Sequence, residues 1–263
     1  MNHLKPGLRS LAANLTFGSL LRMSLFLSIF IAFARAGAEE PKHLAVAEQL
    51  IQQLPSATEN HYGGGARHID WDSKPAAART VCSSFVTLLL MHSYDLSESD
   101  YKSWFGRTNP MAGDYHDAIA AQNRFTQVAK AHDLEPGDIL AVKYNDGHTS
   151  RNGVEDTGHV MVVAGKLERV EGSTDVAPGA QLYKIWVIDS SASGHGTQDT
   201  RHIGKGEFTG GIGKGILRLA VDPHTDAIIA YSWSDSRKSE FFASPARDLL
   251  VGRLDFSKLK AQN

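Results

Sequence analysis

Residues 81–94 read VCSSFVTLLLMHSY, and residues 83–94 form the most apolar segment after the first 36 residues. A buried helix is the structure that such a segment favours. Cys82, the only cysteine of the chain, lies at the start of this predicted helix and follows a Gly-rich loop. There the unpaired N–H groups and the positive end of the helix dipole favour the thiolate, which is the nucleophilic form of cysteine. The alternative is that Cys82 is a small buried residue, as isolated cysteines usually are.

The rest of the chain predicts helices up to residue 131 and strands from residue 138 onward. Two further helices are expected over residues 41–54 and 114–131, and residues 58–80 are expected to form an ordered loop. Six later segments have the apolar pattern of short strands: residues 138–144, 158–164, 183–188, 215–221, 227–233 and 249–254. This order predicts an α+β fold with an antiparallel sheet and not alternating βαβ units.

The first 36 residues differ from the rest of the chain. Basic residues precede an apolar run over residues 23–33, and the small-residue sequence Ala34-Arg35-Ala36 follows shortly after it. This pattern is typical of a secretory signal peptide, and the run is shorter than the ~20 residues that a membrane-spanning helix needs. We therefore expect a signal peptide over residues 1–36 and a single domain over residues 37–263. The protein would be periplasmic or secreted, with no stable membrane anchor after cleavage.

Charge and cysteine content exclude several classes of function. Without the four basic residues that precede residue 37, the chain keeps 23 basic and 29 acidic residues, a net charge of −6. Such a protein has no general attraction to nucleic acid or anionic lipid, so neither is an expected partner. One cysteine can form no internal disulfide, although exported proteins often use them. No spacing typical of a metal site is present beyond the weak pair His195 and His202, so we expect no metal or other cofactor.

Two residues on predicted strands can complete a catalytic site with Cys82. His159 opens an apolar strand, where a side chain is held rigidly, and Asp189 follows the apolar part of the next strand. If these strands are antiparallel neighbours, Asp189 lies beside His159 and orients its ring. A Cys–His–Asp arrangement suits nucleophilic catalysis in which the histidine is the base.

Four motifs in this order resemble those of NlpC-type peptidoglycan peptidases, a papain-like family. The sequences Tyr-Gly-Gly-Gly at residues 62–65 and Val-Cys-Ser-Ser-Phe-Val at residues 81–86 are similar to the family's loop and nucleophile motifs. A Pro-Gly-Asp turn at residues 136–138 and a His-Val strand that starts at His159 are similar to the next two. The resemblance covers residues 62–191. It implies a papain-like core, in which the nucleophile lies at a helix start and the helices pack on an antiparallel sheet.

The resemblance also implies roles for individual residues. Cys82 would be the nucleophile, His159 would be its thiolate–imidazolium partner and protonate the leaving amine, and Asp189 would orient His159. Tyr62 would lie beside the nucleophile and help the Cys82 backbone N–H to stabilise an oxyanion, with simple packing as the alternative. Ser83 would contact substrate, with capping of the helix as the alternative.

Departures from the family pattern keep the function open. Val81 stands where the family usually has Asp, and Asp189 stands where His is commoner. The resemblance implies an exported cysteine peptidase or amidase, a hydrolase that opens an amide bond in peptidoglycan stem peptides, with another peptide or amide as the alternative substrate. The alternatives are a transglutaminase-like acyl transferase, which has the same Cys, His, Asp order, and a catalytically inactive module that binds a cell wall or protein partner on the same fold.

Overall fold

All four α-helices of the described chain lie before residue 121, together with three short strands, and strands dominate from residue 125 onward. The computed structural model describes residues 40–54, 59–63, 65, 67–149, 156–172 and 179–259. The predicted signal peptide, residues 1–36, lies outside these ranges, and within them no helix is long and apolar enough to cross a membrane. The elements follow in this order: α1 (Lys42–Gln53), β1 (Asn60–Tyr62), β2 (His68–Asp70), β3 (Ala77–Thr80), α2 (Cys82–Tyr94), α3 (Glu98–Phe105), α4 (Ala112–Ala120), β4 (Phe125–Gln127), a 3-10 helix (Ala131–Asp133), β5 (Ile139–Tyr144), β6 (Gly158–Val163), β7 (Glu168–Arg169), β8 (Gln181–Ser191), β9 (His202–Gly204), β10 (Glu207–Phe208), β11 (Gly211–Val221), β12 (Ile228–Ser232), β13 (Arg247–Leu254) and a second 3-10 helix (Phe256–Lys258).

The helix that contains Cys82 is buried, as its apolar sequence predicts. Phe85 and Leu89 of α2 are fully buried, and the helix packs against α1, β6 and β8. Leu44 and Leu50 of α1 are buried as well, which confirms the predicted amphipathic helix over residues 41–54. Burial of α2 on nearly all sides follows from its composition, because a helix that is apolar all round needs neighbours all round.

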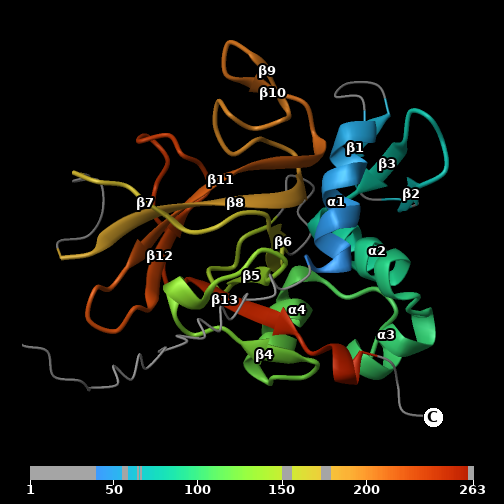
Figure 1. Ribbon diagram of the computed structural model, residues 1–263, viewed down its shortest axis with the longest axis horizontal. Coiled ribbons are helices and arrows are strands. Elements are labelled where there is room, and N and C mark those ends of the chain that lie inside the picture. Colours follow the sequence, from blue (N-terminus) through green and yellow to red (C-terminus); the bar gives the residue numbers. More distant parts are fainter. Residues whose placement is uncertain are drawn as a thin grey trace, which may run out of the picture. The chain divides into compact units, whose positions relative to one another are not determined.

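An eight-stranded sheet forms the centre of the fold. Its order is β12-β11-β8-β6-β5-β13-β4, with β7 also paired to β8, and neighbouring strands are antiparallel. All six predicted strands are present in it, which confirms the α+β class and the antiparallel sheet. Figure 1 shows β8 and β11 as long neighbouring strands, and β1 contacts β11.

The two faces of the sheet belong to two different hydrophobic clusters. Ile139 and Val160 join the cluster that contains the helices, whereas Leu140 and Met161 join a cluster made mostly of strand residues. This alternation is what a sheet with two buried faces requires. By the same alternation, His159 projects on the side of Met161.

The prediction of an ordered loop over residues 58–80 is wrong in part. β1, β2 and β3 form a small three-stranded sheet in which β1 and β3 are parallel. Strands of three or four residues are too short to show an alternating pattern, and a parallel pair depends on contacts that no local sequence signal reports.

The predicted helix over residues 114–131 is also wrong in its second half. α4 ends at Ala120, Gln122 and Arg124 adopt positive φ values of 50° and 60°, and the chain then enters β4. β4 forms a ladder with the end of β13, so pairing with a distant strand overrides the local apolar spacing.

Candidate active site

Cys82 is the first residue of α2, so its thiol lies at the positive end of the helix. Its side chain is buried, with the residue 7% exposed. Ser84 accepts a hydrogen bond from the Val81 backbone N–H (2.8 Å) and donates one to the Val81 carbonyl (3.0 Å). Ser84, and not Ser83, therefore makes the contacts that fix this helix start. Ser83 is buried beside Cys82, and its contact with substrate stays a prediction.

His159 lies between Cys82 and Asp189. Its Nε2 is 2.5 Å from Oδ2 of Asp189, and its ring also forms a hydrogen bond with the Cys82 side chain. Because Nε2 is engaged with Asp189, Nδ1 is the nitrogen left for the sulfur. The structure thus brings together the three residues that the sequence singled out, in the order thiol, imidazole, carboxylate.

The electrostatics of His159 favour its charged form. Burial lowers the pKa of His159, but the charge of Cys82 and the hydrogen bonds that the ring makes with Asp189 and Cys82 outweigh it and raise the pKa to about 10. An imidazolium beside the sulfur at neutral pH is the partner that a thiolate requires. The arrangement can therefore supply a nucleophile and an acid from one ion pair.

Strand pairing explains how His159 and Asp189 meet. Val162 and Val163 of β6 pair with Ile188 and Val187 of β8, so the two strands are antiparallel neighbours as predicted. His159 lies three residues before Val162, and Asp189 follows Ile188 directly. Their side chains therefore approach each other diagonally between adjacent strands.

A second contact fixes the start of α2 to β8. Thr80, two residues before Cys82, donates a hydrogen bond from its hydroxyl to the Ser190 hydroxyl (2.8 Å). Ser190 in turn donates to the Thr80 carbonyl (3.1 Å), and both residues are fully buried. Because Ser190 follows Asp189, this pair sets the spacing between the nucleophile and the carboxylate.

Tyr62 lies close to Cys82, as the resemblance implies. It is paired with Thr80 in the β1–β3 ladder, and Asn60 of the same strand makes two hydrogen bonds to the backbone of Ile212 (2.7 and 2.8 Å). Burial raises the pKa of Tyr62, and the negative charges of Cys82, Asp156 and Asp189 raise it further, so the phenol stays protonated and can donate. Tyr62 is nevertheless 38% exposed, which leaves it accessible to a ligand.

Asp189 is held by a buried group of residues that the sequence did not reveal. His195 donates from Nε2 to Oδ2 of Asp189 (3.0 Å), and Arg201 forms an ion pair with Oδ1 (2.9 Å). Burial raises the pKa of Asp189, but the charges of Arg201 and His195 and the hydrogen bond from His159 hold it well below its usual range. Asp189 is thus an ionised carboxylate although it is fully buried.

Arg201 is itself fixed by Asp199. Its Nε and Nη2 donate to the two carboxylate oxygens of Asp199 (2.9 and 2.8 Å), a bidentate geometry, and both residues are buried. The sequence signal for this group is a glycine repeat on β11. A Cβ on Gly213 would lie 2.4 Å from Arg201 Nε, and one on Gly215 would lie 2.4 Å from Asp199 Oδ2, so only glycine leaves room for the buried side chains.

Trp233 closes one side of the site. Its ring meets the His159 ring edge to face, with centroids 5.3 Å apart, and its backbone carbonyl accepts a hydrogen bond from Nδ1 of His195 (2.6 Å). The indole therefore shields the imidazole from solvent, and the His159 side chain is only 12% exposed.

His195 and His202, the pair considered for a metal, are engaged differently. His195 binds Asp189 and Trp233, whereas the His202 ring packs on Phe208. Within the described ranges, no group of three or more His, Cys, Asp or Glu residues is placed to hold a metal ion.

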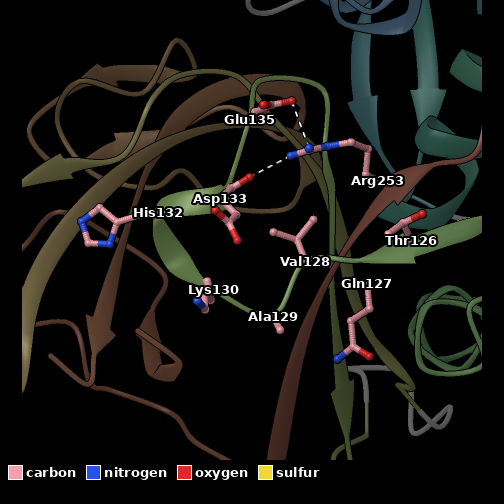
Figure 2. A pocket seen from close by; sticks show the side chains of 9 residues that line it. All are labelled: Thr126, Gln127, Val128, Ala129, Lys130, His132, Asp133, Glu135 and Arg253. Carbon is pink, nitrogen blue, oxygen red and sulfur yellow. Dashed lines mark hydrogen bonds and ion pairs between the residues drawn. The ribbon is translucent and has the colours of Figure 1, made fainter. Parts of the chain in front are cut away.

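Two cavities of the described chain do not include Cys82, His159 or Asp189 in their lining. Figure 2 shows a cavity of about 460 Å³ that contains none of the residues above; there Arg253 forms an ion pair with Glu135 (3.1 Å) and donates to the Asp133 carbonyl (2.7 Å). Arg253 also binds Asp138, whose carboxylate accepts from the Glu135 backbone N–H (2.8 Å) and shapes the Pro-Gly-Asp turn. A second cavity, of about 430 Å³, includes Gly194 and Gly196 on either side of His195.

Comparison with known proteins relates the chain to a viral protein. No family model matches the chain, and no solved structure matches it. Over 227 residues, which are 82% of this chain and 97% of the other, it is 34% identical to the protein named "Uncharacterized protein R653" of Acanthamoeba polyphaga mimivirus. The chain belongs to the same family as that mimivirus protein.

Proposed function

We propose that the protein is an exported cysteine hydrolase of papain-like architecture that cleaves an amide bond in peptidoglycan stem peptides. The observation that carries the proposal is the continuous contact from Cys82 through His159 to the buried Asp189. A lone buried cysteine needs neither an imidazolium beside it nor an ionised carboxylate behind that ring. The peptidoglycan substrate rests on the resemblance to NlpC-type peptidases.

The first half of the reaction follows from the ion pair. The Cys82 thiolate attacks the amide carbonyl carbon, and the carbonyl oxygen becomes an oxyanion. The Cys82 backbone N–H at the helix start and the Tyr62 hydroxyl supply hydrogen bonds to that oxygen. His159 then transfers its proton to the leaving amine, the C–N bond breaks, and a thioester on Cys82 remains.

The second half returns the site to its starting state. His159, now neutral, removes a proton from a water molecule, which attacks the thioester carbonyl. The C–S bond breaks, the carboxylic acid product leaves, and the thiolate–imidazolium pair forms again. Asp189 keeps the His159 ring in one orientation during both steps and stays ionised.

Digestion of purified peptidoglycan tests this function. We expect the full chain to release fragments that mass analysis identifies as products of amide hydrolysis, and we expect Cys82→Ala to release none. Release by Cys82→Ala would contradict the mechanism. If neither protein releases fragments and Cys82 does not react with thiol reagents, the chain is a binding module.

An acyl transferase gives a different result in the same experiment. A labelled primary amine added to the digestion would be incorporated into protein or peptide by a transglutaminase-like enzyme. A hydrolase releases a free acid, so we expect no Cys82-dependent incorporation.

A further inference from the structure

His195 lies between two hydrogen-bond acceptors. Its Nδ1 is 2.6 Å from the Trp233 carbonyl oxygen, and its Nε2 is 3.0 Å from Oδ2 of Asp189. A carbonyl and an ionised carboxylate offer no hydrogen, so each ring nitrogen must carry its own. Both contacts exist together only when His195 is an imidazolium.

The balance of buried charge leads to the same conclusion. In the thiolate–imidazolium state that the proposed mechanism requires, three groups of the site are negative: Cys82, Asp189 and Asp199. His159 as an imidazolium and Arg201 supply two positive charges, so a neutral His195 would leave one buried negative charge without a partner. An uncompensated buried charge is strongly destabilising, whereas a charged His195 brings the group to zero.

The surroundings fix His195 in place. The residue is 4% exposed, and its backbone N–H donates to Oδ2 of Asp199 (2.8 Å). A Cβ on Gly215 would lie 2.8 Å from the His195 Cβ, so β11 has no room for the residue to move toward it. In this position Nε2 of His195 is directed at the carboxylate of Asp189.

We propose that His195 is a positioning residue that acts as an imidazolium and holds Asp189 in the orientation that His159 requires. This inference rests on the proposed function for its purpose. Oδ2 of Asp189 receives hydrogen bonds from both histidines, and Arg201 forms an ion pair with Oδ1. Without His195, the carboxylate loses one of three contacts and is free to turn away from His159.

Nitrogen-15 NMR of the full chain at pH 7 tests the protonation state directly. We expect both ring nitrogens of His195 to carry hydrogen. A neutral His195 ring at pH 7 would overturn the proposal.

Alkylation of Cys82 tests the effect on the site and needs no substrate. Because the chain has one cysteine, iodoacetamide incorporation measured by mass spectrometry reports Cys82 alone. We expect His195→Ala to lower the alkylation rate at pH 7 by about 10-fold, the lower end of the range seen when the residue that holds a metal-ligating histidine is removed. His195→Gln keeps a donor for Asp189 and should stay within about 3-fold of wild type by the same reasoning.

His132→Gln is the matched control. His132 also pairs with an aspartate, Asp226 (2.6 Å), but is exposed and lies outside the site. It should leave the alkylation rate unchanged. A folded His195→Ala protein that reacts at the wild-type rate would contradict the proposal.

If His195→Ala does not fold, His195→Gln decides the question. This variant removes a positive charge from beside Asp189, so the titration of the His159 ring should move to higher pH. An unchanged His159 titration would overturn the inference. If alkylation and titration behave as expected but peptidoglycan is not cleaved, the substrate assignment fails and the role of His195 stands.

Discussion

The site is built from two regions of different character. The motif region, residues 60–191, supplies Tyr62, Cys82, His159 and Asp189, which all lie on motifs or strand ends visible in the sequence. The support region, residues 192–233, supplies His195, Asp199, Arg201, Trp233 and the glycines of β11, and it had no function assigned from sequence. The groups that would react in the proposed mechanism depend on buried contacts from the support region, in which Arg201 and His195 bind the carboxylate of Asp189.

The largest effect is expected in the motif region. Cys82→Ala removes the nucleophile, and hydrolysis should fall by about 10⁶-fold, as it does when other hydrolases lose their nucleophile. Steady-state rates on isolated stem peptides measure it. Residual activity within tenfold of wild type would show that another group attacks the amide.

Asp189→Asn tests the junction between the two regions. The rate should fall by up to about 10⁴-fold, because an amide does not hold the imidazolium as a carboxylate does. The pH profile gives the sign: Cys82 and Asp189 together raise the pKa of His159 to about 10, so wild-type activity should decline only as the pH passes about 10. In the variant that decline should move to lower pH, and an unmoved or higher alkaline limb would contradict the assignment.

Tyr62→Phe separates a hydrogen bond from packing. The change removes only the hydroxyl, and loss of an oxyanion donor costs about 10²-fold in rate. We expect lower kcat, little change in KM and no change in Tm. If the variant and the wild type have the same kcat, Tyr62 serves only for packing.

Gly213→Ala tests the support region through stability. The added Cβ would lie 2.4 Å from Arg201 Nε, and crowding of a packed interior should lower the free energy of unfolding by about 1 to 3 kcal/mol. Denaturant unfolding measures the loss. Gly63→Ala is the control, because a Cβ there meets nothing within 4 Å; equal stability of the two variants would show that the glycine is not needed for Arg201.

The sequence predicts those helices and strands whose formation depends on the pattern of apolar residues along the chain. α2 and six strands of the sheet were predicted because a helix or strand that buries its side chains has a recognisable pattern of apolar residues. α3 was missed although Ser97 and Asp100 form a capping box at its start, which is a readable signal. β1, β3 and β4 could not be predicted, because their pairing partners are distant in sequence.

The residues of the candidate site also fall into two groups: those that the sequence predicts and those that it does not. Cys82, His159 and Asp189 were found because each lies at the end of a predicted element. His195 and Arg201 lie in the loop before β9, and their contacts with Asp189 exist only after β8 and β11 are paired. The alternating glycines at 211, 213 and 215 were the signal that room is left for buried side chains.

Digestion of peptidoglycan in water enriched in oxygen-18 tests the central claim most directly. Hydrolysis through a thioester on Cys82 places one oxygen-18 atom in each new carboxyl group, and Cys82→Ala should form none of these products. Fragments that lack the label, or labelled fragments formed equally by Cys82→Ala, would contradict the account.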